Sequence, residues 1–194
     1  MADRFVSVFE RLERFADRPA AIAMIGLWAT AEAIVLPVVP DVGLCLLVLA
    51  APRRSAHLFA AVVVGAVVGT VVLAALSAQA PDAVRAMLLG LPGIDPAMLA
   101  DADGTLDRHG IAGFARFGPG TPLKVFTDAW VVQGGEVPGL LVGAALNRLT
   151  RIGPAVLVAA AVGWFLGRGI RRREVLTLAA YGAFWLLVYA ILLG

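Results

Sequence analysis

The fold of this chain is most constrained by two apolar segments that are each interrupted by a Pro-x-x-Pro. Pro37 and Pro40 break AEAIVLPVVPDVGL, and Pro119, Gly120 and Pro122 break FARFGPGTPLKVF. Proline removes a backbone donor and clashes with the preceding helical turn, so each break leaves backbone groups without helical partners. Hydrocarbon cannot satisfy such groups, which are tolerated at membrane depth only inside protein or beside a wet cavity. We therefore expect both breaks to lie at a polar site within the protein.

The composition is that of an integral membrane protein. Of the 194 residues, 60% are hydrophobic and only 15% are charged, which lies well outside the range of an ordinary soluble domain. The length allows roughly four to six membrane segments of about 20 residues each, so we expect a single membrane domain over residues 1–194. The sequence has no basic stripe with interleaved aromatic residues, so nucleic acid is not an expected partner.

Both broken segments are predicted to be re-entrant helical hairpins, over residues 19–51 and 111–135. In the first segment, two arms of about 15 residues at 1.5 Å per residue reach only part of the way across a bilayer. The predicted transmembrane helices are the remaining apolar segments, 58–80, 137–167 and 174–194. Gly65 and Gly69 form a small-xxx-small pair, which favours the close approach of another helix.

Two other segments are expected to lie outside the hydrocarbon. In residues 1–18, apolar residues recur at helical spacing with charged residues on the other faces, which predicts an amphipathic helix in the membrane interface. Packing of this helix on the end of the bundle is an equally good interpretation. Residues 81–110 combine several aspartates with prolines and glycines, which is typical of a polar linker with short amphipathic pieces.

The basic clusters predict an orientation. If each hairpin enters and leaves by the same face, the N-terminal arginines, the pair Arg53 and Arg54, and the cluster from Arg168 to Arg173 all fall on one side, which the positive-inside rule makes cytoplasmic. A hairpin followed by a span then occurs twice, in opposite orientations. The sequence therefore predicts an all-α membrane fold with an inverted repeat, and such repeats hold their substrate near the bilayer midplane.

These motifs resemble those of the DedA family, also called the SNARE-associated or VTT-domain family, and most closely its YqaA-like branch. AEAIVLPVVPDVGL is similar to the first family signature, with Glu32 and Asp41 at the acidic positions, and FARFGPGTPLKVFTDAWVVQGG is similar to the second, with Arg116 at the first basic position. Lys124, which follows Pro122, stands near the second basic position. The resemblance implies two opposed re-entrant hairpins in a bacterial inner membrane and a role in moving lipids or lipid-linked phosphates, including undecaprenyl phosphate.

The charged residues suggest roles that do not depend on the family. A charge at the bilayer centre costs about 2.5 to 3.5 kcal/mol even on the insertion scale, so such groups must pair or face water. Arg116 and Lys124 are candidates for contacts to a headgroup phosphate. Arg148 and Arg151 lie three residues apart on one helical face and either extend that basic pocket or extend to the interface.

The acidic residues Glu32 and Asp41 are candidates for proton coupling, because a carboxylate in an apolar pocket binds a proton more readily than one in water. We expect them to face Arg116 and Lys124 across the two hairpin tips. The alternative is that these four residues only form buried ion pairs that hold the hairpins together. Asp128 is expected to neutralise a nearby arginine.

The sequence thus predicts a multi-pass transporter or flippase for anionic lipid phosphates, either undecaprenyl phosphate or a glycerophospholipid, with protons as the coupling ion. We expect no catalytic residue, metal site or cofactor. The sequence allows a homo-oligomer but does not predict the oligomeric state. One alternative is a membrane phosphatase acting on lipid pyrophosphates, for which the second break offers only Thr121 as a nucleophile. The other is a passive lipid scramblase or a scaffold.

Overall fold

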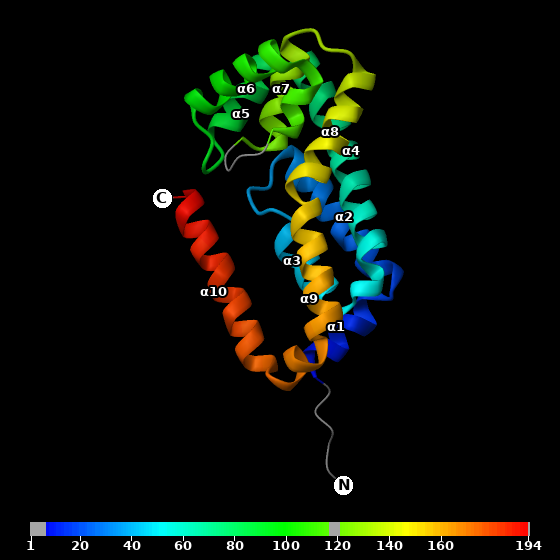
Figure 1. Ribbon diagram of the computed structural model, residues 1–194. Coiled ribbons are helices and arrows are strands. Elements are labelled where there is room, and N and C mark those ends of the chain that lie inside the picture. The colour runs from blue at the N-terminus through cyan, green and yellow to red at the C-terminus, as the bar shows by residue number, and fades with distance from the viewer. Residues whose placement is uncertain (1–6, 117–120, 194) are drawn as a thin grey trace.

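A computed structural model of the chain describes residues 7–116 and 121–193, and this described part is helical and contains no strand (Figure 1). Its α-helices, in chain order, are α1 (Val8–Ala16), α2 (Pro19–Ile34), α3 (Asp41–Ala50), α4 (Ser55–Gln79), α5 (Pro81–Leu89), α6 (Pro96–His109), α7 (Leu123–Val132), α8 (Val137–Arg151), α9 (Gly153–Arg172) and α10 (Glu174–Leu193). Two short 3-10 segments, η1 (Pro52–Arg54) and η2 (Gly110–Ala115), complete it.

Three helices of the described part are long and apolar enough to cross a membrane: α4 with the preceding η1 turn, α9 and α10. Their outward faces carry large apolar side chains, among them Val64 of α4, Phe165 of α9 and Leu186 of α10, which are exposed. In water such continuous apolar faces would be costly, whereas in lipid they are the normal outer surface of a span. By length and composition, then, this is a protein with three candidate membrane-spanning helices.

The first broken segment forms a helical hairpin. Helix α2 runs from the end occupied by α1 toward the middle of the molecule, and α3 returns to the same end (Figure 1). The connection between them, residues 35–40, holds both prolines and is not helical, as the sequence predicted. Helix α4 lies against α2, because Gly65 and Gly69 have no side chains to keep the two backbones apart. A Cβ at Gly65 would collide with the carbonyl of Gly26, so the predicted close approach is confirmed.

The second half departs from the predicted elements in two ways. The predicted first arm of the segment 111–135 is the 3-10 segment η2 and not an α-helix, and α7 forms the other arm. Of the second break, Thr121 and Pro122 are described, whereas Pro119 and Gly120 lie outside the described residues. The predicted single span 137–167 is divided at Ile152 into α8 and α9, because Pro154 has no N–H to continue the helical ladder.

Residues 81–110 are mostly helical. Helices α5 and α6 pack against α7 at the end of the molecule opposite α1 (Figure 1). Asp95 caps α6 by accepting a hydrogen bond of 2.7 Å from the backbone N–H of Met98. The short amphipathic pieces predicted in this polar linker are therefore α5 and α6, which pack together with α7 as a folded helical cap.

Helix α1 packs on the bundle. Phe9 is only 1% exposed and lies against Leu49 and Ala50 at the end of α3, and burial of a side chain of this size contributes roughly 1.5 to 3 kcal/mol. Ion pairs fasten the same end, from Asp17 to Arg54 at 2.7 Å and from Glu13 to Arg171 at 2.8 Å. These contacts bring the N-terminal segment together with both later arginine clusters, so the basic residues gather at one end of the molecule, as predicted.

Candidate functional site

A cleft of about 420 Å³ lies where the tip of the first hairpin meets the second half of the chain. Its walls come from the connection between α2 and α3, the start of α7, the end of α8, the connection between α5 and α6, and the last turns of α10. Five acidic or basic side chains line it: Glu32, Asp41, Lys124, Arg148 and Arg151. Three are basic and two are acidic, so the cleft has a surplus of positive charge when all are ionised.

The backbone at the first break finds its partners in side chains from three other places in the fold. The ammonium group of Lys124 donates to the carbonyl of Leu36 at 2.7 Å, and the indole N–H of Trp28 donates to the carbonyl of Val38 at 2.9 Å. The backbone N–H of Val39 donates to the hydroxyl of Tyr189 at 3.0 Å. A helix broken by two prolines can therefore persist within the protein, because side chains replace the missing helical hydrogen bonds.

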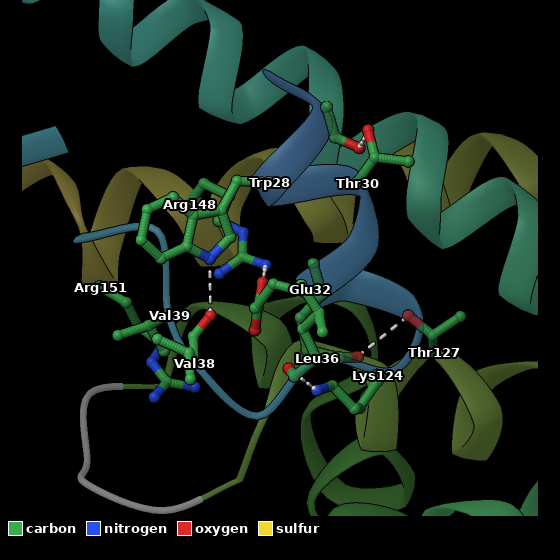
Figure 2. Close-up of polar contacts among 12 residues, drawn as sticks. Trp28, Thr30, Glu32, Leu36, Val38, Val39, Lys124, Thr127, Arg148 and Arg151 are labelled. Carbon is green, nitrogen blue, oxygen red and sulfur yellow. Dashed lines mark hydrogen bonds and ion pairs between the residues drawn. The ribbon is translucent and has the colours of Figure 1, made fainter. Parts of the chain in front are cut away.

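Glu32 and Arg148 form a buried ion pair in the cleft. They come from α2 and α8, point toward each other (Figure 2), and are each 3% exposed. Two charges buried this deeply are stable only when they compensate each other. The pair is not saturated, since the Nε of Arg148 is buried and has no hydrogen-bond partner among the described residues. It therefore retains a donor for a further acceptor.

Asp41 opens α3 at the edge of the same cleft. Its side chain is half-buried, and its Oδ1 atom is buried without a hydrogen-bond partner in the described part of the chain. Lys124 occupies the equivalent place in the first turn of α7. Two helix N-termini therefore meet at the cleft, and their partial positive charges add to the attraction for an anion.

Arg151 completes the basic lining. It lies three residues after Arg148, and its guanidinium donates to the carbonyl of Thr121 at 2.7 Å. Figure 2 shows the two arginines projecting from the same stretch of α8. Of the two interpretations that the sequence allowed, the contacts agree with extension of the basic pocket and not with exposure at an interface. The hydrogen bond from Arg151 to Thr121 ties the end of α8 to the segment that leads into α7.

Arg116 does not lie where the sequence placed it. The expected arrangement set Glu32 and Asp41 opposite Arg116 and Lys124, but the partner of Glu32 is Arg148, and Arg116 is not among the residues that line the cleft. Its exposed side chain instead donates to the hydroxyl of Thr105 on α6 at 3.3 Å. The reason is local, because η2 packs against α6 and directs the residue that follows it toward that helix.

A second polar cluster lies among α5, α6 and α7. Asp128 is completely buried and accepts a hydrogen bond of 3.1 Å from Arg85, which also lies 3.4 Å from Asp103. The sequence expectation that an arginine neutralises Asp128 is thus confirmed. Arg85, Asp103 and Asp128 line neither the cleft nor the cavity of about 540 Å³ at the α1 end of the molecule. The contacts of this cluster join α5 and α6 of the folded cap to α7.

Two parts of the site escaped the sequence reasoning. The aromatic residues Trp28 and Tyr189 bind the broken backbone of the first hairpin, and residues 91–94 supply a wall of the cleft. Both aromatics stand in apolar helices, where their polar atoms need a partner. The presence of polar aromatic side chains in apolar helices was therefore a signal in the sequence. It does not indicate which backbone group each side chain binds.

The residues described do not assemble three or more histidine, cysteine, aspartate or glutamate side chains into a metal site. Comparisons of the chain with protein-family models, with curated proteins and with solved structures find no match. The resemblance to the DedA family rests on the two motifs and stays a prediction.

Proposed function

We propose that this protein moves anionic lipid phosphates across a membrane, and that the cleft holds the phosphate headgroup during transfer. The single observation that carries the proposal is the lining of the cleft. Three basic and two acidic side chains from both halves of the chain converge there, beside apolar residues of α10 such as Val188 and Ile191. A ligand that matches this surface has an anionic head and an apolar tail.

The proposed membrane arrangement follows from the helices. We place α4, α9 and α10 across the bilayer and treat the α2 and α3 hairpin, and the η2 and α7 segment, as re-entrant arms that enter from opposite faces and meet at the cleft. By the positive-inside rule, the gathered arginines support a cytoplasmic location for the end that holds α1, and the membrane of this proposal is the bacterial inner membrane. Membership of the DedA family is part of this proposal, with the two motifs as its support.

The headgroup would bind where donors remain. Through the contacts described, the guanidinium of Arg151 donates only to the backbone carbonyl of Thr121. The buried Nε of Arg148 has no hydrogen-bond partner among the described residues. Lys124 adds a compact positive charge at the start of α7. A guanidinium presents parallel donors that match two phosphate oxygens. The buried ion pair holds the side chains of Glu32 and Arg148 in place, so this part of the site is organised before the lipid binds.

The acidic residues supply a route to proton coupling. The buried Oδ1 of Asp41 has no hydrogen-bond partner among the described residues, and it lies next to the basic side chains that would receive the phosphate. An anionic headgroup arriving there favours the protonated carboxyl group, and its departure favours the ionised one. Binding of lipid and binding of a proton are then linked, which is the requirement for coupled transport.

The test is translocation in liposomes. The purified protein is reconstituted with a fluorescent polyprenyl phosphate or phosphatidylglycerol, and the fraction of lipid that crosses is measured by a quencher that cannot enter. We expect Arg151→Met to slow transfer about tenfold, equivalent to one lost charged contact. The matched control is Arg116→Met, which removes an arginine outside the cleft and should change the rate less than about twofold. Equal losses in the two variants would overturn the cleft assignment.

Coupling is tested in the same liposomes with an imposed proton gradient. We expect the gradient to change the rate of the unaltered protein and to have no effect on Asp41→Asn. If the proton gradient changes the transfer rate of neither protein, coupling is contradicted and the activity is passive lipid scrambling. Release of inorganic phosphate from a lipid pyrophosphate would contradict transport altogether and establish the phosphatase alternative, although no described residue that lines the cleft is a serine, histidine or cysteine.

A further inference from the structure

A second cavity, of about 540 Å³, lies at the opposite end of the molecule from the α5 and α6 cap. It is formed by α1, the end of α3, the η1 turn and the last turns of α9. None of its lining residues is shared with the central cleft. We call it the basic groove, since Arg53, Arg168 and Arg171 line it together with the carboxylates Glu13 and Asp17.

The charges of the basic groove do not cancel. Glu13 is paired with Arg171 at 2.8 Å, and Asp17 is paired with Arg54 at 2.7 Å. Within the described residues, neither Arg53 nor Arg168 forms an ion pair. The groove therefore offers two uncompensated guanidinium groups after its own carboxylates have been satisfied.

One of these arginines is held in place by stacking. The guanidinium carbon of Arg53 lies 5.7 Å from the ring centroid of Trp164 on α9. Stacking on an indole face limits the motion of an exposed arginine and leaves its edge donors free for a ligand. Arg53 is thus oriented for an anion in a way that an isolated surface arginine is not.

The remaining lining of the basic groove is apolar and partly without side chains. Phe9 and Leu49 form its buried floor, and Gly163 allows α9 to approach the backbone of α3 there. Gly167 lies in the groove one turn further along α9, and a Cβ at that position would meet no atom within 4 Å. The groove thus combines an anion-attracting rim with an open apolar channel.

We propose that the basic groove is a binding site for an anionic phospholipid, with its phosphate at Arg53 and Arg168 and an acyl chain along Phe9 and Leu49. Charge complementarity selects an anionic over a zwitterionic headgroup, and the apolar floor selects a lipid over a free phosphate ion. Basic pockets between helices at the cytoplasmic end of membrane proteins attract such headgroups. The lipid joins α1, α3 and α9, so it acts as a component of the fold. It is distinct from the cargo proposed for the cleft.

The experiment is native mass spectrometry of the detergent-solubilised protein with phosphatidylglycerol or phosphatidylcholine. We expect retention of phosphatidylglycerol, and Gly167→Leu should lower this retention about fivefold to tenfold because its side chain fills the channel. The matched control is Gly169→Leu. Gly169 is in the same helix, does not line the groove and also has open space at its Cβ, so that variant should bind as the unaltered protein does. Equal retention by the two leucine variants would overturn the proposal.

A second pair of variants tests the charges and separates the two sites. Arg53→Gln combined with Arg168→Gln should remove the preference for phosphatidylglycerol over phosphatidylcholine. Lys124→Met combined with Arg151→Met alters only the cleft and should leave groove binding intact. If the cleft variant alone abolishes lipid binding, the groove site does not exist, whereas the cleft proposal stands. Displacement of the lipid by inorganic phosphate at matched concentration would likewise contradict a lipid site.

Discussion

Glu32 and Asp128 are both buried carboxylates paired with an arginine from another helix, yet their surroundings differ. The pair of Glu32 and Arg148 is buried on both sides and borders the cleft, beside Asp41 and two further basic residues. Asp128 is paired with Arg85, whose side chain is 33% exposed, and the two lie among packed helices. Burial of an ion pair therefore does not by itself mark a functional site. We base the proposed site on the cavity and on the excess of positive charge beside the pair of Glu32 and Arg148.

The comparison also separates two uses of the same interaction. A buried ion pair costs much of its Coulombic gain in desolvation, so it is weak evidence of stabilisation, although removal of one partner is strongly destabilising. The Arg85 pair has a second carboxylate, Asp103, and access to water, which lower the cost of a change. The Arg148 pair is buried on both sides and has no second carboxylate within ion-pair distance among the described residues. The two pairs should therefore respond differently to the same substitution.

The largest effect is expected from Arg148→Met. This change leaves Glu32 buried without a cation, and such losses cost about 3 to 5 kcal/mol. Denaturant unfolding in detergent micelles measures the change in the free energy of unfolding. The double variant Glu32→Gln with Arg148→Met removes both charges and should recover most of the loss. A single variant that is no less stable than the double one would show that Glu32 is not held as an ionised partner.

A smaller loss, of about 1 to 3 kcal/mol, is expected from Arg85→Met, because water at the exposed side partly replaces the guanidinium at Asp128. Lipid transfer per folded molecule should stay within about twofold of the unaltered protein, in contrast to the cleft variants. The same liposome assay measures it, with the folded fraction taken from gel filtration. A selective loss of lipid transfer would mean that the cluster of Arg85, Asp103 and Asp128 belongs to the functional site, and that the two buried ion pairs do not differ in function.

Lys124 both lines the cleft and donates a hydrogen bond to the carbonyl of Leu36, and two substitutions separate these roles. Lys124→Met removes the charge and the donor to Leu36, so we expect about tenfold weaker headgroup binding and about 1 to 3 kcal/mol lower stability. Lys124→Gln keeps an amide that can donate to the same carbonyl, and it should lose the affinity while retaining most of the stability. Titration with a soluble polyprenyl phosphate analogue and thermal unfolding give the two quantities. Identical behaviour of both variants would contradict the separation.

The smallest effect concerns Tyr189→Phe. The backbone N–H of Val39 loses its acceptor, which costs about 0.5 to 1.5 kcal/mol, and the hairpin tip loses its contact with α10. Amide hydrogen exchange should accelerate at Val39 and its neighbours. Tyr181→Phe is the matched control, because the hydroxyl of Tyr181 donates to the carbonyl of Val42, and its loss leaves the Val39 amide protected. Unchanged exchange at Val39 in Tyr189→Phe would show that α10 does not hold the tip.

Several elements could be predicted from the sequence because their causes are local. Pro37 and Pro40 end one helix and precede the next whatever surrounds them, since a proline cannot continue the helical ladder. Gly65 and Gly69 lie on one face of α4 because of the helical period, so the close approach of another helix was expected, and the structure identifies that helix as α2. The error at the predicted span 137–167 arose because its apolar character concealed the interruption that Pro154 introduces.

The partners of the charged residues could not be read from the sequence in the same way. The predicted opposed hairpin tips set Glu32 and Asp41 opposite Arg116 and Lys124. The ion pair instead joins Glu32 to Arg148, and Arg116 donates to Thr105. Helical spacing fixes which residues share a face. It does not fix which helix that face meets, and the 3-10 geometry of η2 was not evident from its composition.

The sequence by itself thus determined the apolar helices, the place of the first break, the close packing of some helix on Gly65 and Gly69, and the collection of basic residues in segments that share one end. These depend on composition and on interactions within a few residues. Only the tertiary structure decided that Lys124, Trp28 and Tyr189 form hydrogen bonds with the non-helical backbone between α2 and α3. It also decided that the arginines at the cleft are Arg148 and Arg151 and do not include Arg116. Those contacts join residues far apart in the chain, and their geometry is set by how helices pack, which no local pattern encodes.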